Sequence, residues 1–269
     1  MKNNLVERYG TAAFVIGSII GTYFFSRPKK RGARTKLSRK QQHKIDQNLM
    51  TPANATFGVV WPVLYAGAIG LAIHQAMPSE QFNPRYTKAR PWLLACYALN
   101  GIFGYFFSKS SKRHRIGAAL TTVSMVGPAL FLHNRLEIGS NKVSEPENTI
   151  RKTIGMYAGW LTAAAAISVT TLIQEAGQLV DNESARRAAL CILPITAGTG
   201  LFVSKKLNDP YYLITIIAAL IGISVKQKDE HNDVSRLAAT LAMSLIVSFI
   251  SRMDETQILK ETYSSLNKL

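Results

Sequence analysis

The chain has 269 residues and a mass of 29.6 kDa, and 47% of its residues are hydrophobic while 18% are charged. This composition is too apolar for a disordered chain and too poor in charge for an ordinary soluble enzyme. The 32 basic and 16 acidic residues give a net charge of +16, which is typical of chains that meet nucleic acid, anionic lipid or a membrane. No aromatic stacking platform or groove-reading motif accompanies the charge, so nucleic acid is not expected as a partner.

The charged residues leave eight long runs that contain no Asp, Glu, Lys or Arg. A membrane-spanning helix needs about 17 to 25 predominantly apolar residues, whereas a soluble helix carries charges along its outer stripe. The runs therefore predict an all-α protein, a polytopic bundle of transmembrane helices. They comprise residues 10–26, 56–77, 91–108, 116–133, 153–174, 188–204, 210–225 and 237–251.

The first of these runs is expected to be a membrane anchor rather than a cleaved signal peptide. No small-x-small cleavage site follows it, and a dense run of basic residues that would stop transfer follows instead. We therefore assign residues 1–26 to an N-terminal tail with the first transmembrane helix, and residues 27–55 to a basic connecting loop.

This loop holds nine basic residues between positions 27 and 44. Its first interpretation is topological, because short basic loops stay on the cytoplasmic side of a membrane. With eight spans, both termini then lie on the side opposite the loop. A second interpretation is that the loop binds the headgroups of anionic lipids such as cardiolipin. The residues proposed to contact these headgroups are Lys29, Lys30, Arg31 and Arg34.

Towards the C-terminus the apolar runs become shorter. Residues 210–225 and 237–251 barely reach the minimum span, so an interfacial or re-entrant helix is an alternative to a full span for each of them. We assign residues 175–251 to additional transmembrane helices. In residues 252–269, apolar side chains recur at helical spacing, which predicts an amphipathic tail suited to the membrane surface or to docking.

The sequence shows no recognised motif for catalysis or metal binding. Cys96 and Cys191 lie singly in separate runs and are predicted to be buried thiols, so neither a disulfide framework nor a metal site is expected. No nucleotide-binding loop, nucleophile elbow or HExxH motif occurs. The runs also contain no carboxylate, which disfavours an ion-coupled transporter. Among the possible small-residue contacts between helices are Gly17 and Gly21 of the first run.

Aromatic and amide residues within the runs resemble the tryptophan-rich sensory protein and translocator protein (TspO) family. The segment 52–65, PANATFGVVWPVLY, is similar to the family signature of its second helix. The third run, with Leu99, Asn100, Phe103, Phe106 and Phe107, resembles its L-N-x-x-W-x-x-F-F pattern. The fifth, with Tyr157, Trp160, Thr162 and Ser168, resembles its Y-x-x-W-x-T pattern. The resemblance implies a five-helix core, in which residues 56–174 follow the loop, and longer relatives carry further helices after it.

The resemblance also implies a pocket in the helix bundle for a tetrapyrrole, sterol or other flat hydrophobic ligand. The implied lining residues are Trp61, Asn100, Phe103, Trp160 and Ala164. Ala55 and Phe103 stand where the family has tryptophans to which porphyrin chemistry is attributed. A non-enzymatic binding protein is therefore expected, with a tetrapyrrole as a possible ligand and no metal or tightly held cofactor.

Two other functions remain open at this point. The chain could be an accessory structural subunit of a larger membrane complex, possibly a mitochondrial respiratory one, or a passive carrier of a lipid or metabolite. A homodimer would fit the ligand-binding protein, whereas partners within a membrane complex would fit the accessory subunit. The sequence does not distinguish a mitochondrial membrane from a bacterial envelope.

Overall fold

The computed structural model describes residues 2–26, 48–109, 111–179 and 181–266, and the side chains of residues 5–24 and of those from 48 to 253 within these ranges. These residues form eight α-helices, a short 3-10 helix and no strand. The prediction of an all-α bundle is confirmed, and each helix contains all or most of one charge-free run. The helices are α1 (Lys2–Ser26), α3 (Asn54–His74), α4 (Pro84–Phe107), α5 (Lys112–Arg135), α6 (Glu147–Glu175), α7 (Asn182–Lys206), α8 (Tyr211–Gln227) and α9 (Asn232–Leu266), with the 3-10 helix at Pro78–Glu80.

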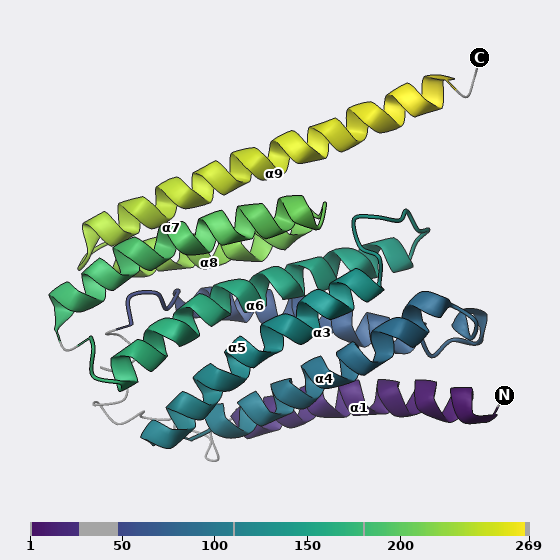
Figure 1. The fold of residues 1–269 in the computed structure, drawn as a ribbon, viewed down its shortest axis with the longest axis horizontal. Helices are drawn as coiled ribbons and strands as arrows, with labels where there is room; N and C mark the ends of the chain where they lie inside the picture. Colours follow the sequence, from purple (N-terminus) through teal and green to yellow (C-terminus); the bar gives the residue numbers. More distant parts are fainter. Residues whose placement is uncertain (1, 27–47, 110, 180, 267–269) are drawn as a thin grey trace.

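Successive helices run up and down, so that α1 begins and α9 ends at the same end of the molecule (Figure 1). We call this the termini end. The end of α1 at Ser26 and the beginning of α3 at Asn54, which the basic loop connects, lie at the opposite end, which we call the loop end. Because an even number of antiparallel helices returns the chain to its starting side, this arrangement agrees with the expectation that both termini lie opposite the loop.

Five of the described helices are long and apolar enough to cross a membrane, namely α3, α5, α6, α7 and the Asn232–Met253 part of α9. Helix α8 is apolar but shorter, with 17 residues, as its short run predicted. Helix α9 has 35 residues and continues from the last run into the tail, so this run lies in a helix that is long enough to cross a membrane. Helices α1 and α4 do not meet this measure of length and hydropathy in the described residues.

The first five long helices form a closed ring in the order α1, α4, α5, α6 and α3, and α3 contacts α1 again. Helix α8 packs outside this ring on α6 and α3, α9 covers α8, and α7 contacts α6, α8 and α9. The ring corresponds to the expected five-helix core, and α7, α8 and α9 are the additional helices. They are joined to the core mainly through α6.

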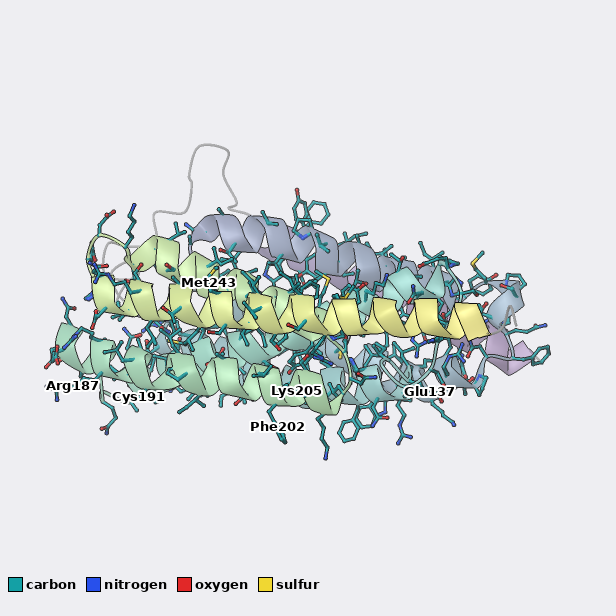
Figure 2. The ribbon with its side chains drawn as sticks, turned by 90° about the horizontal axis from the view of Figure 1, so that it is seen from above. Glu137, Arg187, Cys191, Phe202, Lys205 and Met243 are labelled. Carbon is teal, nitrogen blue, oxygen red and sulfur yellow. The ribbon has the colours of Figure 1, made fainter. Side chains whose placement is uncertain are left out.

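The outer surface of the bundle is rich in apolar side chains. Phe202 of α7 and Met243 of α9 are 68% and 61% exposed, and both lie on the outside of the additional helices (Figure 2). Cys96 is buried as predicted, but Cys191 is exposed on the outer face of α7. Hydrophobic surface of this kind is stable against lipid tails, which agrees with a multi-pass membrane protein.

Arg8 joins the beginning of α1 to the end of α3. Its side chain is 4% exposed, and its guanidinium donates hydrogen bonds to the carbonyl oxygens of Gln75 (3.2 Å), Ala76 and Met77. These carbonyl groups lie in the turn that follows His74, outside the hydrogen-bonding pattern of the helix, and the buried guanidinium gives them a donor.

We expect Arg8→Ala to lower the free energy of unfolding by about 2 kcal/mol, since it removes the guanidinium donor from the carbonyl groups of the buried residues Gln75 and Ala76. Chemical denaturation of the protein in detergent micelles measures this loss. Arg8→Lys keeps the positive charge but not the planar guanidinium group with its several donors. The free energy of unfolding of this variant should therefore lie between those of the wild type and the alanine variant. Equal stability of all three proteins would contradict the assignment.

Candidate functional site

An aromatic cluster lies where α3 faces α6. Trp160 of α6 is 1% exposed, and its ring meets the ring of Trp61 edge to face, with centroids 6.0 Å apart. Phe57, one turn before Trp61 on α3, meets Trp160 in the same manner at 5.6 Å. Tyr65, one turn after Trp61, stacks on it at 5.0 Å. Residues spaced by four along α3 lie on one face of the helix, which explains why three aromatic rings line up towards α6.

Asn100 brings a polar group from α4 to this cluster. Its side chain is 1% exposed, and its Nδ2 donates to the Tyr65 hydroxyl at 3.5 Å, which is the long limit of a hydrogen bond. The side-chain carbonyl oxygen of Asn100 is buried and has no hydrogen-bond partner among the described residues. A buried carbonyl without a donor is unfavourable, because it has lost its hydrogen bond to water and gained no other.

The structure therefore brings together three of the five residues predicted to line a pocket. Trp61 and Trp160 touch directly, and Asn100 joins them through Tyr65. Ala164 is half-buried and lies one turn beyond Trp160 on α6. Phe103 lies one turn beyond Asn100, but its ring stacks on Phe107 of the same helix at 5.2 Å.

Several aromatic residues of this region were not predicted as site residues. Phe57 and Tyr65 take part in the cluster, and Tyr97 of α4 stacks on Tyr157 of α6, with ring centroids 6.1 Å apart and both side chains buried. Phe57, Tyr65 and Tyr157 belong to the matched motifs, so the motif positions were the available signal. Tyr97 lies one turn before Asn100, and helical spacing alone would have placed it nearby.

The grooves on the surface of the protein lie between a different pair of helices from those that form the aromatic cluster. Two open grooves, of about 300 and 430 Å³, run between α1 and α4, and Phe14 lines both. Gly17 and Gly21 line the smaller groove, and a methyl group added at Gly17 would meet no atom within 4 Å. The expectation that Gly17 permits a close helix contact is therefore wrong within this chain.

The predicted lipid-headgroup residues Lys29, Lys30, Arg31 and Arg34 lie outside the described residues. Among those that the structure does describe, no group of three or more His, Cys, Asp or Glu side chains is arranged to hold a metal ion. His74 at the end of α3 hydrogen-bonds the Tyr86 hydroxyl through Nδ1 at 2.6 Å.

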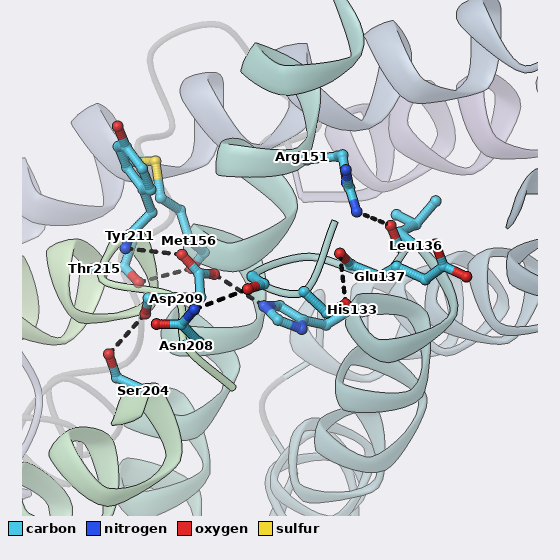
Figure 3. Close-up of polar contacts among 12 residues, drawn as sticks. His133, Leu136, Glu137, Arg151, Met156, Ser204, Asn208, Asp209, Tyr211 and Thr215 are labelled. Carbon is cyan, nitrogen blue, oxygen red and sulfur yellow. Dashed lines mark hydrogen bonds and ion pairs between the residues drawn. The ribbon is translucent and has the colours of Figure 1, made fainter. Parts of the chain in front are cut away.

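A second polar cluster lies at the termini end, where the ring meets the additional helices (Figure 3). Nε2 of His133, at the end of α5, is 2.9 Å from Oδ2 of Asp209, and both side chains are buried. Asp209 lies between α7 and α8, and its Oδ1 accepts the backbone N–H of Tyr211 at 2.9 Å. The carbonyl oxygen of Asp209 accepts the Ser204 hydroxyl, and Arg252 of α9 donates to that hydroxyl oxygen at 2.5 Å. The cluster thus connects α5, α7, α8 and α9.

Comparison with known proteins agrees with this architecture. A family model described as TSPO-like protein matches residues 11–251. The chain belongs to the TSPO-like protein family. No curated protein and no solved structure matches this TSPO-like chain. The family match runs from α1 into α9 and so includes the additional helices as well as the five-helix ring.

Proposed function

We propose that this TSPO-like membrane protein binds a flat hydrophobic ligand, such as a tetrapyrrole, sterol or lipid, between α3, α4 and α6 without catalysing a reaction. The observation that carries the proposal is the buried, unpartnered carbonyl oxygen of Asn100 beside the rings of Tyr65, Trp61 and Trp160. Aromatic faces stack on a planar ligand, and an amide supplies a directional hydrogen bond. Entry of the ligand requires the aromatic rings to move apart, because they contact one another in this structure.

Binding is tested with the purified full-length protein and protoporphyrin IX, whose Soret absorbance reports its own environment. We expect Asn100→Leu and Trp160→Phe to weaken binding by about tenfold and about threefold, since the first removes a hydrogen-bond acceptor and the second reduces a stacking surface. The matched control is Trp92→Phe, because Trp92 stacks on Phe131 at 4.3 Å on the α4 and α5 seam and not in the cluster.

Stability measurements separate a ligand contact from a structural role. Asn100→Leu removes a buried oxygen without a partner and only one long hydrogen bond, of 3.5 Å to Tyr65, so the free protein should unfold no more readily than the wild type. Weaker binding with unchanged stability would support a ligand site. Equal affinity for protoporphyrin in all four proteins would refute the assignment of these residues.

A second candidate is an accessory subunit of a larger membrane complex, and the length of α9 favours it. Its 35 residues extend over about 52 Å, whereas the hydrocarbon core of a bilayer is about 30 Å thick. The helix therefore projects beyond the membrane at the termini end. Extraction in mild detergent distinguishes the two functions, because a subunit would migrate with a large assembly and a ligand-binding protein as a monomer or homodimer.

A further inference from the structure

The corner where α4 ends and α5 begins carries cations without matching carboxylates. Lys109, Lys112 and Arg113 are exposed, and none of them forms an ion pair with a described residue. The nearby carboxylate of Glu175 is 3% exposed and receives Arg115 through two hydrogen bonds of 2.6 and 3.1 Å. The three exposed cations therefore have no anionic partner within the described part of the chain, and we call them the corner cations.

Local helix structure does not explain the corner cations. The first turn of α5 contains no acidic residue, and Ser111 makes no capping hydrogen bond from its side chain. The beginning of a helix carries partial positive charge, so basic residues are unfavourable there. Helix α7 starts at the same end with Asp181, whose carboxyl accepts the Ser184 N–H at 2.7 Å, and this bond lowers the pKa of Asp181.

Unlike the corner cations, the basic residues near the start of α7 form ion pairs within the protein. Arg186 pairs with Glu183 at 2.9 Å and with Asp233 of α9, and Arg187 pairs with Glu183 at 2.8 Å. The loop end thus offers two different surfaces among the described residues. The start of α7 is balanced in charge, whereas the corner between α4 and α5 is positive.

Aromatic side chains adjoin the corner cations on the membrane side. Tyr105 and Phe107 at the end of α4 are 48% and 61% exposed. The ammonium group of Lys109 lies 4.0 Å from the centroid of the Tyr105 ring and donates to its hydroxyl at 2.8 Å. The charge-free run of α4 ends at Ser108, so the rings lie at the edge of the hydrocarbon and the cations directly beyond it. Exposed aromatic rings followed by basic residues are typical of the membrane interface.

From this arrangement we infer that the α4 and α5 corner is a binding surface for the headgroups of anionic phospholipids. The phosphate and other anionic groups of the lipid would complement Lys109, Lys112 and Arg113, while Tyr105 and Phe107 lie against its acyl chains. Basic residues next to a membrane raise its affinity for anionic lipids, and this attraction decreases with ionic strength. The surface is separate from the basic loop and from the aromatic cluster between α3 and α6.

Native mass spectrometry of the full-length protein in mild detergent tests this surface. Phosphatidylglycerol and phosphatidylcholine with identical acyl chains are titrated separately. All proteins carry glutamine at Lys29, Lys30, Arg31 and Arg34, so that the four headgroup residues proposed for the basic loop do not mask the result. We expect K109Q/K112Q/R113Q to weaken phosphatidylglycerol binding at least fivefold and to leave phosphatidylcholine binding unchanged.

The matched control is R135Q/K205Q/K206Q, which removes the same residue types from exposed positions at the termini end. It should change phosphatidylglycerol affinity less than twofold. Equal losses in both triple variants would show a general charge effect and overturn the proposal, as would unchanged affinity in the first. Displacement of the lipid by millimolar inorganic phosphate would indicate a free-anion site instead and also overturn it. Protoporphyrin binding, measured in parallel, tests the bundle site independently.

Discussion

Gly159→Ala is expected to lower the free energy of unfolding by about 3 kcal/mol, at the upper end of typical overpacking effects. A methyl group at this position of α6 would lie 1.9 Å from the Tyr212 carbonyl oxygen and 2.9 Å from Oγ1 of Thr215. The nearer atom belongs to the backbone of α8 and cannot rotate away. The two helices would have to separate, and the 2.7 Å hydrogen bond from Thr215 to the Met156 carbonyl would be lost.

Denaturation in detergent micelles, followed by circular dichroism, measures this loss. Gly198→Ala on α7 is the matched control, because a methyl group there meets no atom within 4 Å. Alanine is favoured over glycine within a helix by up to about 1 kcal/mol, so the control should be as stable as the wild type or more so. If both variants lost stability equally, close packing of α6 on α8 would not be the cause.

Asp209→Ala is expected to destabilise the protein by about 3 to 5 kcal/mol, because it leaves the buried imidazole of His133 without its partner. The change also removes the acceptor for the Tyr211 N–H at the start of α8. Asp209→Asn retains a side-chain oxygen that can accept a hydrogen bond, so this variant should lose less stability than Asp209→Ala. The exposed Asp229, between α8 and α9, provides the control, and its replacement by alanine should have little effect.

A double-mutant cycle with His133→Leu isolates the pair, since it subtracts the effect of each single change. We expect a coupling energy of about 2 kcal/mol between the two positions, within the range for residues in direct contact. Additive losses would mean that Asp209 acts only through the backbone of α8 and not through His133. The cycle therefore tests whether the ring and the additional helices are joined by this contact.

The aromatic site shows how far sequence patterns reach. Trp61, Asn100 and Trp160, which the matched motifs name, lie in one region of the structure, because helical spacing and alternating direction determine which faces meet. Phe103 was also expected there, but its ring pairs with Phe107 on its own helix. A side chain's rotamer depends on the space left by neighbouring helices, which sequence spacing does not report.

The glycines likewise show that sequence spacing does not identify which residues contact another helix. Gly17 of α1 and Gly159 of α6 both lie in apolar runs, yet only the second faces a helix backbone at close range. Which of the two permits a contact depends on the packing partner, and for Gly159 that partner is α8, more than fifty residues later in the chain.

The amino-acid sequence alone determined that this protein is a bundle of membrane helices, where those helices lie and which family they resemble. Hydrocarbon excludes ionised side chains so strongly that charge-free runs mark the helices directly. Only the tertiary structure decided that α9 is one long helix, that α8 packs against Gly159, and that His133 meets Asp209. These features depend on contacts between distant segments, and distant contacts form only when the helices assemble around one another.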